Sequence, residues 1–491
     1  MWKAEPMSTR HDRRPDRATG GGAVVGVWGR GLHSRPVLLF AFAFAVMADP
    51  VSSVAYAIEA ALRALGGELA LLVPTMGLVV AVIAVVVANY LQIVGRYPRG
   101  GGAAAATGEA FGEGVAFVPI GALIVDFTLT IAISCAAGAS ALIAYLPALA
   151  GWRVVLALGL VAVVAAGTWF GHVGRAVFAL LTTGFVVLAA AVLVFGATAH
   201  PTAHSSAQPA IPATAAGVAS HGPVLAVALA FPVAMALATG VEAPSSAIAQ
   251  LGQLDDPGRR RFGRVTLWAT LLIVATLTLG LAAEAARLGI GVPTAESTQI
   301  AELARAVAPY GVFAAFQLVT AMLLLSAASS SFAAGPGLLN ALARYRHRDG
   351  HHSGILPGWL GRTNHHHTPY WGVVVFALTS AAVVVAAGGL DQELVLFYAV
   401  SVFVSFLAGL CAMARFSLTA RSWSQLALNL LGALAVVFTL AVNLTRPDAV
   451  VSLTAALALA AGLYWAWVRA GRPRGVRDAV ANAETETEPA A

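Results

Sequence analysis

Residues 36–65 read PVLLFAFAFAVMADPVSSVAYAIEAALRAL, an apolar stretch with an acid and a proline at its centre. About 20 apolar residues in a helix cross the roughly 30 Å hydrocarbon core of a bilayer, so this stretch can span a membrane. Asp49 would then lie at mid-depth, where a carboxylate is costly. Pro50 lacks a backbone donor and disfavours helix at the residue before it. We therefore expect an unwound helix here, with Ser52, Ser53 and freed carbonyls beside the carboxylate.

The composition of the whole chain agrees with a membrane protein. Of its 491 residues, 59% are hydrophobic and only 11% are charged, whereas soluble chains carry charge on about a quarter of their residues. This composition excludes a disordered protein, a nucleic-acid binder and an ordinary cytosolic enzyme. The two cysteines, Cys135 and Cys411, lie in apolar runs and indicate neither a disulfide framework nor a metal site.

Twelve stretches are long and apolar enough to span a bilayer, which predicts an all-α polytopic membrane protein. The stretches are 36–65, 68–95, 116–148, 153–171, 175–197, 222–250, 264–288, 308–340, 370–388, 391–414, 425–443 and 449–469. Of the connections, we expect 251–263 to be a basic loop, and 289–307 could form a short helix.

The distribution of the basic residues predicts the orientation of the chain in the membrane and accounts for its net charge of +6. Of the 29 Lys and Arg residues, 24 fall on the side of the N-terminus and 5 on the other. By the positive-inside rule, both termini are then cytoplasmic. We expect a disordered cytosolic tail over 1–35, a ten-helix transport core over 36–414, helices 11 and 12 over 415–470, and a second cytosolic tail over 471–491.

Nearly all acidic residues lie in tails, loops or the ends of predicted spans, but Asp49, Asp126 and Glu242 lie in the interior of the first, third and sixth spans. Glu59, nearer the outer end of the first span, is interpreted as solvated. No Lys or Arg lies in the interior of the spans to neutralise the three carboxylates. Their charge must be balanced by a bound cation, a proton or the dipoles of helix ends, so they predict an ion or proton path.

Hydroxyl groups accompany these acids at spacings that a helix would bring together. Tyr56 lies two turns after Asp49, and Thr130 follows Asp126 at the i,i+4 spacing that puts both on one face. Thr239 precedes a helix-breaking glycine in the sixth span. Carboxylates, hydroxyls and open carbonyls form a shell of hard oxygen ligands, which suits a desolvated monovalent cation.

A weak repeat relates the first and sixth spans. Pro50-Val51-Ser52-Ser53 and Pro244-Ser245-Ser246 each lie within a span, five spans apart. Paired interruptions in the first helix of each half are typical of transporters built from inverted repeats, with the binding site at the breaks. We therefore expect the first and sixth helices to be broken.

Four motifs are informative when taken together. They are Asp49-Pro50-Val51-Ser52-Ser53-Val54-Ala55-Tyr56-Ala57, Tyr97-Pro98 with Gly100-Gly101-Gly102-Ala103, Asp126-Phe127-Thr128-Leu129-Thr130, and Thr239-Gly240-Val241-Glu242-Ala243. Together they resemble the KimA-type potassium transporters, a branch of the amino acid–polyamine–organocation (APC) superfamily. The resemblance covers spans 1–10. It implies a LeuT-like fold of 5+5 inverted repeats with two extra helices, and potassium uptake driven by proton symport.

The resemblance also implies roles for individual residues. It assigns cation binding to Asp49, Tyr56, Asp126, Thr130 and Thr239, and proton coupling or gating to Glu242. The family usually has a small residue in place of Pro50 and a C-terminal cytosolic domain with dimer contacts, so a homodimer remains an alternative to a monomer. The membrane family and the preference for Arg over Lys indicate a bacterial inner membrane.

Other functions remain open alternatives. The loop from Arg348-Asp349-Gly350 to Thr368-Pro369 resembles that of general APC amino acid permeases, so an amino acid or polyamine permease is the second hypothesis. Asp49 would repel a substrate carboxylate, which favours a cation. A channel would need symmetric rings of ligands, and no enzyme or cofactor motif is evident. The polar loop with His347, His351, His352, His365, His366 and His367 could bind a metal or sense pH.

Overall fold

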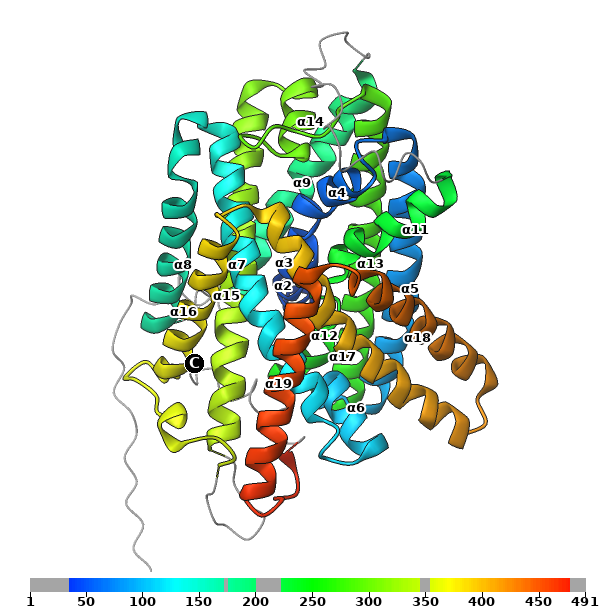
Figure 1. Ribbon diagram of the computed structural model, residues 1–491, viewed down its shortest axis with the longest axis vertical. Helices are drawn as coiled ribbons and strands as arrows, with labels where there is room; N and C mark the ends of the chain where they lie inside the picture. The colour runs from blue at the N-terminus through cyan, green and yellow to red at the C-terminus, as the bar shows by residue number, and fades with distance from the viewer. Residues whose placement is uncertain (1–34, 172–174, 200–221, 345–353, 477–491) are drawn as a thin grey trace, which may run out of the picture. The chain divides into compact units, whose positions relative to one another are not determined.

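The computed structural model describes residues 35–171, 175–199, 222–344 and 354–476 (Figure 1). Residues 1–34 of the expected tail 1–35 and residues 477–491 of the expected tail 471–491 lie outside these ranges, as do His347, His351 and His352. Contacts divide the chain into a short unit that ends at Phe40 and a main unit, Ala41–Ala491. In the main unit, every regular element of the described residues is a helix.

Ten segments of the described residues are helical, long and apolar enough to cross a membrane. Nine of them contain α5 (Leu72–Arg96), α7 (Phe117–Tyr145), α8 (Arg153–Phe170), α9 (Arg175–Thr198), α13 (Asp256–Leu288), α15 (Tyr310–Ala343), α17 (Asp391–Thr419), α18 (Trp423–Asn443) and α19 (Pro447–Arg469). The tenth is composite and consists of α11 (Pro223–Ala234), η3 (Met235–Ala238), α12 (Ala243–Ala247) and η4 (Ile248–Gln250).

The remaining elements are shorter. They are α2 (Arg35–Val46), α3 (Ala48–Ser52), α4 (Val54–Ala64), α6 (Gly102–Phe111), α14 (Gln299–Val307), α16 (Tyr370–Ala386), η1 (Leu69–Leu71), η2 (Pro147–Trp152) and η5 (Gly358–Gly361). The other two predicted spans correspond to these shorter elements. The first, 36–65, is divided among α2, α3 and α4, and the other, 370–388, contains α16. The short helix considered for 289–307 is α14.

The predicted loop at 251–263 is wrong for most of its length. Helix α13 begins at Asp256, because the Asp255 carboxylate caps it by accepting a hydrogen bond from the Gly258 amide at 3.1 Å. Pro257 lies in the first turn, where its missing N–H has no intrahelical partner to lose. The three basic residues of this segment, Arg259, Arg260 and Arg261, therefore all belong to the start of a long helix.

The interruption in the first span is milder than the sequence predicts. Helical structure is interrupted only at Met47 and Ser53, and Asp49 and Pro50 lie within the short helix α3. Pro50 is tolerated there because it belongs to the first turn of α3. The Ser52 hydroxyl donates to the Asp49 carbonyl and the Ser53 hydroxyl to the Pro50 carbonyl, each at 2.7 Å. The serines therefore satisfy carbonyls that we expected to be open.

Helix α7 packs against α15, α17 and α19, which makes it a central element of the described bundle (Figure 1). Its contact with α19 depends on small residues. A Cβ atom on Gly121 would lie 2.7 Å from both the Ala456 carbonyl oxygen and the Ala460 amide nitrogen. Close backbone approach through small residues is a common way for membrane helices to associate.

Gly121→Ala should destabilise the protein, because the added methyl group meets backbone atoms of α19 that cannot rotate away. We expect a loss of about 1–3 kcal/mol in the free energy of unfolding, as for other overpacked cores. Gly159→Ala on α8 is the matched control, since a Cβ there has no neighbour within 4 Å. Thermal melting in one detergent compares the two variants, and equal melting temperatures would contradict the packing described here.

Candidate functional site

The interruptions of the first and sixth predicted spans touch each other directly. Thr239 is extended and Gly240 has φ +72°, so the chain leaves helical geometry between η3 and α12. A Cβ atom on Gly240 would lie 2.7 Å from the Asp49 carboxyl carbon, so the carboxylate lies directly against the glycine. The Ser53 hydroxyl also approaches the Leu237 carbonyl at 3.1 Å. Only glycine combines this backbone conformation with the space that Asp49 requires.

Tyr56 and Thr239 lie beside this contact. Tyr56, on α4, is 2% exposed, and its hydroxyl interacts with the Thr239 side chain and with the charges of Asp49 and Asp126. The Thr239 hydroxyl donates to the Ala236 carbonyl at 2.8 Å. The structure thus gathers four of the predicted residues, from α3, α4, α7 and the interruption before α12.

Asp126 connects this group to the sixth-span glutamate. It is buried in α7, and its Oδ1 atom has no hydrogen-bond partner among the described residues. Its main electrostatic neighbours are Glu242 and then Asp49. Thr130 is also buried, one turn further along α7. All six predicted site residues are therefore buried or partly buried within one region of the bundle.

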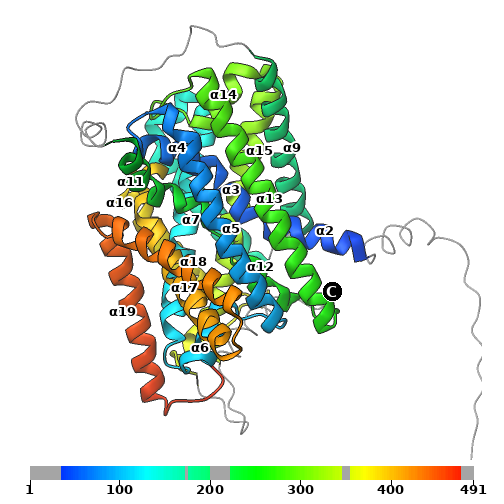
Figure 2. The same ribbon diagram turned by 90° about the vertical axis from the view of Figure 1, so that its right-hand side faces the viewer.

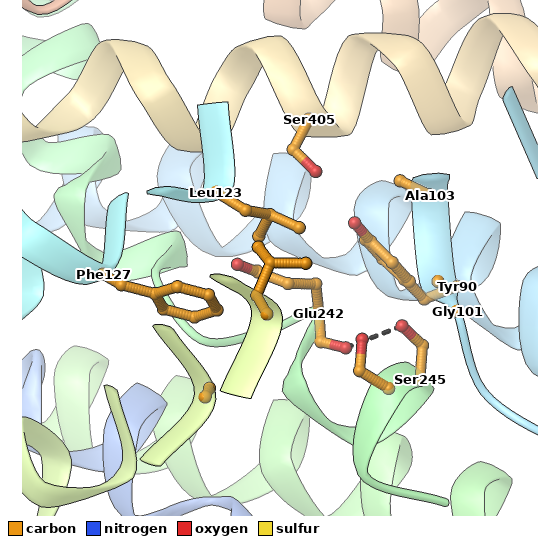
Figure 3. Close-up of a pocket in the computed structure, with 12 residues that line it drawn as sticks. Tyr90, Gly101, Ala103, Leu123, Phe127, Glu242, Ser245 and Ser405 are labelled. Atoms are coloured by element: carbon orange, nitrogen blue, oxygen red, sulfur yellow. Dashed lines mark hydrogen bonds between the residues drawn. The ribbon is translucent and has the colours of Figure 1, made fainter. Parts of the chain in front are cut away.

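Glu242 lines a small cavity of about 30 Å³ (Figure 3). Tyr90 of α5 and Ser405 of α17 line the same cavity. Neither the Tyr90 hydroxyl nor the Glu242 Oε2 atom has a hydrogen-bond partner within the described chain. A polar cavity holds a water molecule once it offers about 10–15 Å³. This one can hold one or two water molecules between the unpaired oxygens.

The glycine-rich segment before α6 packs on α12 and η4, the elements that directly follow Glu242. Gly100 and Gly101 have φ +91° and +94°. A Cβ on Gly100 would lie 2.7 Å from the Ala249 Cβ, and one on Gly102 would lie 3.1 Å from the Ser245 hydroxyl oxygen. Ser245 in turn donates to the Glu242 carbonyl at 2.7 Å. The glycines therefore allow this segment to pack directly on α12.

The carboxylates of Asp49, Asp126 and Glu242 form no salt bridge within the described part of the chain. The ion pairs found there involve other acidic residues. Uncompensated buried carboxylates are strongly unfavourable in a medium of low dielectric. The site therefore favours a ligand or a state that brings positive charge, either a bound cation or protons.

A polar network lies at the other end of the first span. The Arg153 guanidinium donates to the Ser140 hydroxyl at 2.7 Å, and Ser140 donates to the Asp391 carboxylate at 2.6 Å. The Gln392 amide bonds both Asp391, at 2.9 Å, and the Tyr56 carbonyl, at 3.4 Å. The network thereby links α7, α8 and α17 to the helix that carries the Tyr56 phenol.

Glu59, also on α4, lies at the same end of the first span as this network. The prediction that it is solvated is wrong. It is 2% exposed. Its carboxylate accepts a hydrogen bond from the Arg63 guanidinium at 2.8 Å and another from the backbone N–H of Gln299 at 2.9 Å. Glu59 and Asp391 both line a cavity of about 480 Å³. The partners of Glu59 lie on its own helix and 240 residues away, which explains why local hydropathy missed them.

Sequence reasoning also missed Tyr90 and Ser405. Both look like isolated polar residues in apolar helices, and only the fold brings them to Glu242. The adjacent pair Asn89-Tyr90 in an otherwise apolar span was the available signal. Of the histidine cluster, His365, His366 and His367 are described, in the turn before α16. No group of three metal-ligating side chains gathers in the described residues.

Comparison with known proteins shows the family to which the chain belongs. The sequence model of the amino acid permease family matches residues 38–470. The potassium transporter KimA of Bacillus subtilis (strain 168) is 30% identical over 372 residues, which are 74% of this chain and 59% of that protein. The chain thus matches somewhat more than half the length of this relative.

Solved structures give a weaker likeness. Two mutants of the manganese transporter of Eremococcus coleocola are each 15% identical, with TM-scores of 0.45 and 0.46. Each match covers 90% of this chain and 96% of the other. The family match and the ten long apolar helices together identify the chain as a multi-pass membrane protein that belongs to the amino acid permease family of the APC superfamily, with similarity to its KimA-type branch.

Proposed function

We propose that this APC-superfamily transporter takes up potassium, or a similar monovalent cation, together with protons by alternating access. The observation that carries the proposal is the group of three carboxylates, Asp49, Asp126 and Glu242, without a salt bridge in the described residues. Tyr56, Thr130 and Thr239 complete a set of oxygen ligands. Such ligands suit a hard cation that has lost its water.

The proposed architecture is a LeuT-like 5+5 inverted repeat with twelve spans. Ten spans are the long apolar helices. The segmented run α2–α4 and the shorter α16 supply the other two, and interruptions at Met47, Ser53 and Thr239–Glu242 are the breaks in helices 1 and 6. The distribution of 24 basic residues to one side and 5 to the other supports cytoplasmic termini in a bacterial inner membrane.

A cation accounts for the chemistry of the site better than a zwitterionic amino acid. Amino acid carriers of this type hold the substrate carboxylate near open backbone amides and the positive end of a half-helix. Here the Asp49 carboxylate occupies the break and Pro50 provides no amide hydrogen. The same negative charge would attract an amine, so a polyamine or amino acid permease remains the alternative function.

In the proposed mechanism the cation binds between the interruptions, against α7. Asp49, Tyr56 and Thr239 hold it from one side, and Asp126 with Thr130 from the other. The network of Arg153, Ser140, Asp391 and Gln392 ties the outer ends of the helices together. Glu242 takes up a proton from the small cavity that it shares with Tyr90 and Ser405, which neutralises one carboxylate before the helices rearrange.

Asp126→Asn should abolish cation uptake, because it removes one of the charges that stabilise the dehydrated ion. Loss of one partner of a buried charged interaction typically costs about 3–5 kcal/mol, which corresponds to more than about a hundredfold in affinity. The measurement is rubidium or potassium uptake into liposomes with the interior alkaline. Glu68→Gln is the control, since Glu68 is an exposed carboxylate outside the site.

Two results would contradict this proposal. The first is a folded wild-type protein that takes up neither rubidium nor potassium, and the second is an Asp126→Asn variant that transports as fast as the wild type. Melting temperatures of both proteins separate a lost site from a lost fold. Uptake of a labelled polyamine or amino acid by the wild type, with no cation uptake, would favour the alternative function.

Gly240→Ala should reduce uptake by about tenfold or more, because an alanine at φ +72° is strained and its methyl group displaces Asp49. Gly252→Ala is the matched control, since a Cβ at Gly252 has no neighbour within 4 Å. The same liposome assay compares the two variants. Normal uptake by Gly240→Ala would show that the contact between Asp49 and Gly240 is not required.

A further inference from the structure

A groove of about 680 Å³ lies between four helices, away from the carboxylates. Its walls belong to α5, α13, α17 and α18. Helix α5 packs against both α13 and α18, and α17 packs against α5 and α18. Figure 2 shows α5 between α13 and α18 in this part of the bundle. The groove opens where α5 and α17 end and where α13 and α18 begin.

The groove has a basic mouth. Arg264 and Arg96 both line it. Arg264 reaches from α13 to α5, where a Cβ on Gly95 would lie 3.4 Å from its guanidinium nitrogen. It forms no salt bridge with the described residues. Arg96 lies over the Phe416 ring at 3.9 Å and pairs with Glu109 at 2.5 Å. The mouth therefore carries one unneutralised guanidinium.

The face of α13 that holds the lining residues Arg264 and Trp268 continues beyond the groove to Leu272, and its side chains change in the same order as the layers of a lipid leaflet. Arg264, Trp268 and Leu272 follow at i, i+4 and i+8, so they share one face at about 6 Å intervals along the axis. Trp268 is 57% exposed and Leu272 is 68% exposed. A cation, then an aromatic ring, then an aliphatic side chain match the phosphate, interfacial and acyl layers of a membrane.

We propose that this groove binds one anionic phospholipid of the cytoplasmic leaflet. The orientation of the chain proposed above puts the mouth of the groove on that side. Arg264 and Arg96 hold the lipid phosphate, and the Gln425 side-chain amide can donate hydrogen bonds to the headgroup and glycerol. The acyl chains lie over Trp268 and Leu272. Basic pockets between membrane helices on the cytoplasmic side commonly bind anionic lipid headgroups.

The apolar part of the groove favours a lipid over a soluble phosphate compound, which could match only the basic mouth. A free phosphate would contact only the basic mouth of the groove. The apolar part, with Leu91, Met413 and Trp268, would then have to be filled by a separate molecule. A phospholipid fills both parts at once. Its phosphate also suits the planar guanidinium of Arg264, which can form two parallel hydrogen bonds to it.

The test uses purified full-length protein, stripped of lipid and titrated with phosphatidylglycerol whose acyl chains carry bromine. Bromine quenches the fluorescence of a nearby tryptophan, and Trp268→Phe identifies the part of the signal that comes from the groove. We expect saturable quenching with phosphatidylglycerol, and binding about fivefold weaker in Arg264→Gln. Arg264→Lys keeps the charge but cannot form the two parallel hydrogen bonds, so it should bind more tightly than Arg264→Gln and less tightly than the wild type.

The control is Arg469→Gln, which alters an exposed arginine beside a tryptophan at the predicted cytoplasmic end of α19, outside the groove. It should leave binding unchanged. Equal quenching by brominated phosphatidylcholine, equal loss in Arg469→Gln, or full displacement by glycerol phosphate would each overturn the proposal. None of these measurements requires transport, so the lipid site can fail while the proposed cation uptake stands, and the reverse.

Discussion

The site depends on one electrostatic constraint, the burial of Asp49, Asp126 and Glu242 close together without a salt bridge in the described residues. Carboxylates in such surroundings are stable only when positive charge or protons accompany them. Helical structure is interrupted where the surrounding chain makes room for these carboxylates. Gly240 interrupts the sixth span to make room for Asp49, and the glycine-rich segment before α6 packs on α12, the helix that directly follows Glu242.

The constraint also suggests how two events can be coupled. Asp126 interacts electrostatically with both Glu242 and Asp49, so a charge gained at one end of the group alters the energy of an ion at the other. The unpaired oxygens of Glu242 and Tyr90 adjoin a cavity that can hold water. At the opposite end, Gln392 links the Asp391 network to the Tyr56 carbonyl. Under the proposed function, these contacts would connect proton binding, cation binding and the ends of the helices near Asp391.

The three carboxylates could be chosen as candidate site residues from the sequence, because acidic residues are rare in the interior of its predicted spans. The sequence also predicted the helical class and most of the long helices from hydropathy. It could not predict that Ser52 and Ser53 would satisfy the carbonyls near Pro50, because this depends on the local path of α3. Nor could it reveal Tyr90, Ser405 or the burial of Glu59, whose partners come from distant parts of the chain. The start of α13 was missed because a cap at Asp255 outweighed the basic composition of the segment.

The most direct test of the central claim is whether potassium itself binds to the purified protein. Melting temperature is measured at constant ionic strength while choline is replaced by potassium, because a ligand that binds only the folded state stabilises it by about 2.7 kcal/mol at a hundred times its dissociation constant. We predict that potassium raises the melting temperature of the wild type and has no effect on Asp49→Asn or Asp126→Asn. Stabilisation of the wild type by a polyamine or an amino acid, with none by potassium, would contradict the account.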